Sequence, residues 1–328
     1  MKRVALTFAL LMLAVTAPAN AGLFDKTPKP VFLEAQGNRA EEFKQLVRDD
    51  SALDKVAKLP APNPAKVAIA TIRMNFATQS SASSTENRSG GKTSSQYVDY
   101  NLLGVQPKDV QKMVDIFYAD LTKLLTSRGY AVQSQDFLLS ESKFADAVAS
   151  TKSPVASEAL VKKEMAVTAY AGQTAPFSGM GHGAMDANAV SRAKSGVILL
   201  ELDFDVDIVA MTKASDKGVW LQWKQIEHKP ALHVKSGWVR VHINGKGAQF
   251  SFLEKTMLPG EVFASVEKKA TSVTDTAALV IGTLMGAGGS SSSYNITPVE
   301  NFPEAVAKSL QPFAEVIANA LPLPAAAQ

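Results

Sequence analysis

The chain has 328 residues, 46% of them hydrophobic, which is enough to bury one sizeable core, or one core with a helical appendage. It contains no cysteine, which excludes disulfides, thiolate metal sites, a cysteine nucleophile and a lipidated cysteine anchor. Its 34 lysines and arginines nearly balance 31 aspartates and glutamates, so net charge gives no indication of nucleic-acid binding.

The N-terminus has the pattern of an export signal. Lys2 and Arg3 precede an apolar run from Val4 to Val15, and Ala19-Asn20-Ala21 supplies the small residues of a cleavage site. The run is shorter than the ~20 residues of a membrane-spanning helix. We therefore predict a signal peptide over residues 1–21, a mature chain from Gly22 and a periplasmic location, with outer-membrane association or secretion as alternatives.

Composition divides the remaining chain into three predicted parts. Residues 22–64 are expected to be a lead-in, with a polar helix from Glu34 to Lys58 and a proline-rich linker after it. Residues 65–260 are expected to form an α/β (or α+β) domain with a mixed sheet, flanking helices and a C-terminal β-hairpin region. Residues 261–328 are expected to be a helical segment with a Gly/Ser-rich linker.

The first half of the predicted domain alternates strands and helices. Lys66 to Phe76 is nearly continuously apolar, which indicates a central strand covered on both faces. The polar stretch from Thr78 to Ser95 indicates a solvated loop, and helical spacing predicts a helix from Gln106 to Gly129, followed by a strand at Tyr130. Further expectations are helices at Ser140–Ser150, Pro154–Lys163 and Ala184–Lys194, an extended segment at Met165–Ala171 and a glycine-rich loop at Gln173–Gly183.

The second half begins with the strongest predicted strand, Val197 to Met211, which has one apolar face and one acidic face. We expect the apolar face to be buried and the acidic face to be exposed to solvent. Asn244-Gly245 is a favoured hairpin dipeptide. The remaining predicted elements are strands at Val219–Ile226, Ala231–Ile243 and Gln249–Lys255, a helix at Glu261–Leu284, a break at Gly286–Ser293 and a helix at Val299–Leu321.

The acidic face is the most unusual local pattern, with carboxylates at Glu201, Asp203, Asp205 and Asp207. Same-face side chains on a strand lie ~7 Å apart, so these groups would attract basic cross-strand partners or a divalent cation. Lys235, Arg240 and His242 could supply the partners, and we prefer this ion-pair interpretation to an ordinary solvated face.

A metal site is the remaining interpretation of the acidic face. Its candidate ligands are Glu201, Asp203, Asp205, Asp207, His233 and His242. Their spacing matches no zinc motif, and a flat strand does not wrap oxygen ligands around an ion. We therefore expect no metal, no cofactor and no catalytic residue.

Three tryptophans, Trp220, Trp223 and Trp238, lie in the predicted hairpin region. Such a cluster either closes the end of a core or forms an exposed patch for a partner. We take these three residues as the candidate partner-binding residues.

Three segments carry a likeness to a known family: Val67 to Ile72, Leu121 to Val132 and Ser195 to Val209. Their order, a strand, a long helix with a Gly-Tyr junction and a strand leading into a polar-faced hairpin, resembles the α/β domain of the curli-secretion channel family. It is also similar to the N-terminal domain of the Tol-system propeller protein. The resemblance implies a non-catalytic role in envelope assembly or export.

We therefore expect an exported, non-catalytic protein that binds another envelope component or a second copy of itself, and no nucleic acid. One alternative is a metal-binding or hydrolytic periplasmic protein that uses the acidic strand and the histidines. Another is a membrane-active secreted protein, or peripheral membrane association, through the apolar stretch before Gly286.

Overall fold

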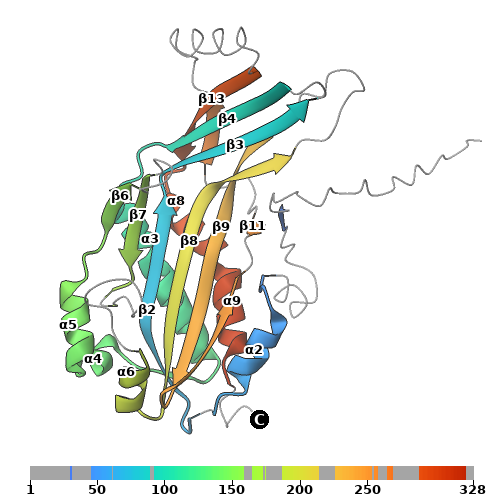
Figure 1. Cartoon of the computed structure of the whole chain (residues 1–328). Coiled ribbons are helices and arrows are strands. Elements are labelled where there is room, and N and C mark those ends of the chain that lie inside the picture. Colours follow the sequence, from blue (N-terminus) through green and yellow to red (C-terminus); the bar gives the residue numbers. More distant parts are fainter. Residues whose placement is uncertain are drawn as a thin grey trace, which may run out of the picture.

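The computed structural model describes residues 30–31, 46–60, 62–88, 92–158, 165–172, 174, 187–213, 226–252, 255–257, 264–268 and 288–322. The predicted signal peptide, its cleavage site and most of the lead-in lie outside these ranges. The fold centres on a mixed sheet with helices on both faces (Figure 1), which confirms the expected α/β class.

Within the described residues, the central sheet has nine strands in the order β1-β11-β9-β8-β2-β7-β6, with β10 paired to β9 and β5 paired to β2. Its strands are β1 (Pro30–Val31), β2 (Lys66–Ala77), β5 (Ala131–Val132), β6 (Val155–Glu158), β7 (Met165–Tyr170), β8 (Val197–Lys213), β9 (Ile226–Ile243), β10 (Lys246–Ser251) and β11 (Lys255–Met257).

Strand β2 occupies the centre that its apolar sequence predicts. It runs parallel to β8 on one side and antiparallel to β7 on the other. Residues 67–72 are buried on both faces, because helices pack against both faces of this half of the strand. Beyond this point, β2 carries half-buried polar side chains at Arg73 and Asn75.

One face of the sheet holds the main core. It packs against helices α2 (Asp50–Ala57), α3 (Pro107–Ser127), α8 (Phe302–Ser309) and α9 (Gln311–Ala320). Helix α3 confirms the predicted helix, and Gly129 just after it has the positive φ of 86° that a left-handed cap requires. The predicted single helix Val299–Leu321 is instead two helices, because the chain turns at Leu310 and Pro312 starts a new first turn.

Among the described residues, the opposite face is covered at one end by α4 (Gln135–Leu139), α5 (Ser142–Ser150) and α6 (Ala187–Ala193) (Figure 1). Phe144, Val190 and Leu199 are buried in the small second core beneath these helices. The predicted helices at Ser140–Ser150 and Ala184–Lys194 correspond to α5 and α6, and α4 was not predicted. Farther along the strands, the same face carries polar side chains.

A second sheet crosses the far end of the first, in the order β12-β13-β4-β3 (Figure 1). Its strands are β3 (Gln79–Arg88), β4 (Lys92–Leu102), β12 (Ala264–Lys268) and β13 (Gly288–Pro298). The predicted loop at Thr78–Ser95 and the predicted break at Gly286–Ser293 are therefore wrong. These serine-rich segments lack apolar alternation, but β4 and β13 satisfy each other's backbone groups through parallel pairing.

The predicted helix at Glu261–Leu284 is wrong where the structure describes it. Residues 264–268 form β12, which pairs antiparallel with β13, so backbone pairing with a distant segment decides their conformation. Residues 269–287, including Gly286, lie outside the described ranges. In the part of the chain that is described, no helix is both long enough and apolar enough to cross a membrane.

Three smaller expectations also change. Val155–Glu158 is strand β6, paired with β7, where a helix over Pro154–Lys163 was predicted; the strand pairing supplies backbone partners that the local sequence does not reveal. The strand predicted at Ala231–Ile243 begins earlier, at Ile226, as part of β9; the rest of the strand predicted at Val219–Ile226 lies outside the described residues. The strand predicted at Gln249–Lys255 is divided between β10 and β11.

The predicted hairpin is confirmed, because Asn244 and Gly245 both have positive φ, 52° and 78°. All but Thr174 of the predicted glycine-rich loop lies outside the described residues.

Candidate functional site

The acidic strand lies on the sheet face that α4–α6 cover only in part. We call the region beyond these helices the polar face. Its residues are Arg73 and Asn75 of β2, Thr168 and Tyr170 of β7, Glu201, Asp203, Asp205 and Asp207 of β8, and Ser236, Trp238, Arg240 and His242 of β9. Alternation along each strand directs these side chains away from the main core.

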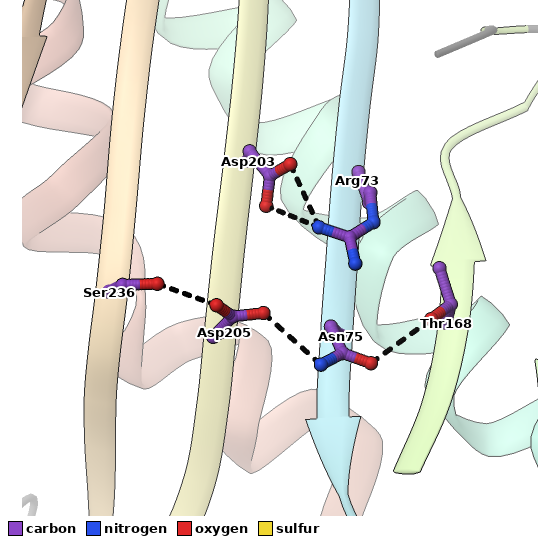
Figure 2. A network of polar contacts seen from close by, with 6 residues as sticks. All are labelled: Arg73, Asn75, Thr168, Asp203, Asp205 and Ser236. Atoms are coloured by element: carbon purple, nitrogen blue, oxygen red, sulfur yellow. Dashed lines mark hydrogen bonds and ion pairs between the residues drawn. The ribbon is translucent and has the colours of Figure 1, made fainter. Parts of the chain in front are cut away.

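The first row across the polar face is an ion pair between β2 and β8. Arg73 Nη1 donates hydrogen bonds to both carboxylate oxygens of Asp203, at 2.8 and 2.9 Å (Figure 2). Burial raises the pKa of Asp203, and this effect outweighs the opposite effect of Arg73. Burial acts to lower the pKa of Arg73, but the attraction of Asp203 leaves that pKa raised.

The second row is a chain of neutral donors that ends on Asp205. Asn75 Nδ2 donates to Asp205 Oδ1 at 3.1 Å, and Ser236 Oγ donates to Asp205 Oδ2 at 2.5 Å. Thr168 Oγ1 donates to Asn75 Oδ1 at 3.0 Å, so the chain crosses β7, β2, β8 and β9 (Figure 2). Both oxygens of Asp205 are therefore hydrogen-bonded.

The third row places a buried carboxylate beside two basic side chains. Glu201 is opposite Arg240 in the strand register and its side chain is only 1% exposed. Its oxygens lie 3.8 Å from Arg240 Nη1 and 3.6 Å from His242 Nε2, which are ion-pair distances but too long for hydrogen bonds. Within the described residues neither Glu201 oxygen has a hydrogen-bond partner.

His242 is held from the other side by helix α6. Its Nδ1 lies 3.0 Å from Asn188 Oδ1. A Cβ on Gly247, the residue opposite His242 on β10, would stand 2.9 Å from the same nitrogen. The absence of a side chain at Gly247 therefore makes room for the imidazole ring.

The last carboxylate of the row, Asp207, pairs with Lys235 at 3.1 Å. Lys235 reaches it from a β-bulge, where the register of β8 and β9 shifts between Asp205 and Val206. The bulge places His233, not Lys235, opposite Asp207.

The predicted cross-strand ion pairs are therefore present for Lys235 and Arg240, and His242 Nε2 lies 3.6 Å from Glu201. The expectation that the whole acidic face is exposed to solvent is wrong for Glu201 and Asp207. These two residues are buried because the basic side chains lie against them. In the described ranges, no three histidine or carboxylate side chains come together as metal ligands.

Trp238 lies on the polar face and not in the core, where one interpretation had placed it. It is half-buried, and the guanidinium carbon of Arg240 lies 4.3 Å from the centre of its ring. Arg240 Nε also donates to Gln249 Oε1 of β10 at 2.6 Å, which holds the stack in place. Trp220 and Trp223 lie outside the described residues.

Sequence reasoning missed the contributions of β2 and β7. Arg73 and Asn75 stand at alternate positions in a mostly apolar strand, and this spacing was a sufficient signal that both lie on one face. Thr168 gave no such signal, because its role depends on the pairing of β7 with β2.

The polar face offers a fixed pattern of charges and hydrogen-bonding groups. Asp203 and Asp205, its two half-buried carboxylates, are each engaged by side chains of neighbouring strands, and Glu201 lies beneath Arg240.

Comparisons of the chain with protein-family models, curated proteins and solved structures find no match.

Proposed function

We propose that this protein is an exported, non-catalytic envelope protein that binds another envelope component through its polar face. The observation that carries the proposal is the stacked pair of Trp238 and Arg240, which is partly exposed on β9 and is held by the hydrogen bond from Arg240 to Gln249 of β10. Tryptophan and arginine are the residue types most enriched at the energetic centres of interfaces.

The contacts around this pair favour binding. Gln249 fixes the guanidinium of Arg240, and Glu201 attracts it from below. A side chain that is already ordered loses little conformational entropy when a partner arrives. The polar face is therefore pre-organised for docking.

The same contacts argue against a hydrolase that uses the acidic strand. A general acid or base must reach the substrate within hydrogen-bond distance. Asp205 has both oxygens occupied, Asp203 is bound by Arg73, and Glu201 is buried beneath Arg240. The export of the protein rests on the N-terminal signal pattern, and a role in the envelope agrees with the sequence resemblance.

Site-specific photo-crosslinking in living cells tests this proposal. A photoreactive amino acid replaces Trp238, and in a matched control it replaces Lys123, an exposed residue of α3 on the other side of the sheet. We expect light-dependent adducts from position 238 and none from position 123. The adduct mass separates a second copy of the chain from a different protein.

Two results would contradict the proposal: no adduct at position 238 in correctly folded protein, or the same adducts at both positions. A metal-dependent hydrolytic activity of the purified protein that is abolished by Asp203→Asn would instead support the alternative function.

A further inference from the structure

We infer that the partner of the polar face presents an acidic polypeptide segment to Arg240 and Arg73. This inference rests on the proposed function, and it goes further because it gives the chemistry of the partner. The inference is drawn from the exposed fraction of each charged side chain on the polar face.

In each cross-strand ion pair that Arg or Lys forms within the described residues, the basic side chain is the more exposed member. The side-chain exposures are 30% for Arg73 against 18% for Asp203, 32% for Lys235 against 5% for Asp207, and 38% for Arg240 against 1% for Glu201. The carboxylates thus form a lower layer and the cations an upper one. A partner that approaches this face meets positive charge first, although the sequence pattern is acidic.

The two arginines retain donors that their own carboxylates do not use. A guanidinium has five N–H groups. Arg240 uses Nε for Gln249, while its Nη1 is too far from Glu201, at 3.8 Å, for a hydrogen bond. Arg73 contacts Asp203 through Nη1 alone (Figure 2), and a hydrogen bond to the Tyr170 hydroxyl uses one more of its five N–H groups. Each arginine can therefore receive a further carboxylate.

The stack on Trp238 favours a polypeptide over an anionic glycan. Sugar rings commonly bind by packing against an open aromatic face. Arg240 lies over a face of the Trp238 ring at 4.3 Å and occupies it. The arginine on that face presents charge and N–H groups, which suit an aspartate or glutamate side chain.

Asp205 adds a restriction on how the segment lies. It is a half-buried carboxylate whose described hydrogen bonds come from the neutral side chains of Asn75 and Ser236. It would repel an acidic group placed directly above it. Attraction at Arg73 and Arg240, together with repulsion at Asp205, would set the register of the partner.

Binding of defined polymers to the purified full-length mature protein tests the inference. The probes are poly-L-glutamate, a uronic-acid polysaccharide of similar length and poly-L-lysine. The test variant is Arg73→Gln/Arg240→Gln, and the control is Lys123→Gln/Lys308→Gln, which removes the same charge from exposed positions of α3 and α8. The near balance of charges in the sequence keeps net charge from driving the binding.

We expect poly-L-glutamate to bind best, and the arginine double variant to bind it about tenfold more weakly than the control variant. Binding by the wild type should also fall steeply between about 0.05 and 0.5 M NaCl, because salt screens exposed charges. This salt series decides the question even if the arginine variant folds poorly.

Equal losses in the two double variants, or wild-type binding that salt does not change, would overturn the inference. Stronger or equal binding of the polysaccharide would overturn the choice of a polypeptide. A crosslinked partner from position 238 together with no binding of poly-L-glutamate would leave the proposed function standing and remove only the acidic chemistry.

Discussion

Asp203 shows how burial and pairing compete at a single residue of the polar face. Arg73 stabilises its carboxylate through two hydrogen bonds. Burial nevertheless dominates, and the pKa of Asp203 is raised. A raised pKa in the folded state means that folding favours the protonated acid, so this group contributes most stability at low pH.

Asp203→Asn should therefore change the pH dependence of stability in a defined direction. The contribution of Asp203 is fully present below its unfolded pKa and is lost as pH rises through its folded pKa. The melting temperature of the wild type, compared with that of Asp203→Asn, should fall progressively as pH rises from about 4 toward neutrality. Thermal melts across this range measure the difference.

Asp146→Asn is the matched control, because Asp146 is an exposed carboxylate on α5. It should show no comparable trend. If the wild type instead gained stability over Asp203→Asn with rising pH, the pairing with Arg73 would outweigh burial and the explanation would be wrong.

For the individual residues of the polar face, the sequence predicted the acidic row and three of its basic partners on β9. It did not predict which carboxylates are buried, because burial depends on the bulge at Lys235 and on how Arg240 lies over Glu201. Nor did it predict Arg73 as a partner, because the parallel pairing of β2 and β8 joins residues 130 positions apart.

Among the elements, α9 connects the C-terminal part of the chain to the main core. The ring of Phe313 on α9 lies edge-on to Phe252 at 4.7 Å and to Phe204 at 6.0 Å. Phe313 is fully buried. This aromatic cluster joins α9 to β8 and to the residues that follow β10.

Phe313→Ala should lower the free energy of unfolding by about 3–5 kcal/mol, since it removes buried area and leaves a cavity. Chemical denaturation measures the loss. Phe137→Ala on α4 is the control, because Phe137 is only partly buried, and it should lose clearly less. Equal losses would mean that α9 does not belong to the cooperative core.

Elements with strong periodicity, such as α3 and β8, were predicted well, because their burial pattern is local. The second sheet was missed, since β3, β4 and β13 are serine-rich and carry no apolar alternation. Their structure depends on the parallel pairing of β4 with β13, which lies almost two hundred residues away in the sequence. Such pairing leaves no signal in one sequence.

For the whole molecule, the unequal covering of the two sheet faces connects fold to proposed function. In the described part of the chain, four helices cover one face around the main core, while α4–α6 cover one end of the other (Figure 1). On this second face, β8 changes from apolar to acidic side chains beyond Leu199, and β2 carries Arg73 and Asn75 beyond Ala70. The fold thereby leaves a charged face of the sheet beyond these helices, and this is the surface through which we propose that a partner binds.

Hydroxyl-radical footprinting tests this central claim most directly, through oxidation of Trp238 in intact cell envelopes and in the purified protein. Tyr118 on α3, which is likewise a half-buried aromatic residue, serves as the internal reference. We predict that Trp238 is oxidised several-fold more slowly in envelopes, because a partner covers the polar face, while Tyr118 reacts equally in both samples. Equal oxidation of Trp238 in both samples, or equal protection of both residues, would contradict the account.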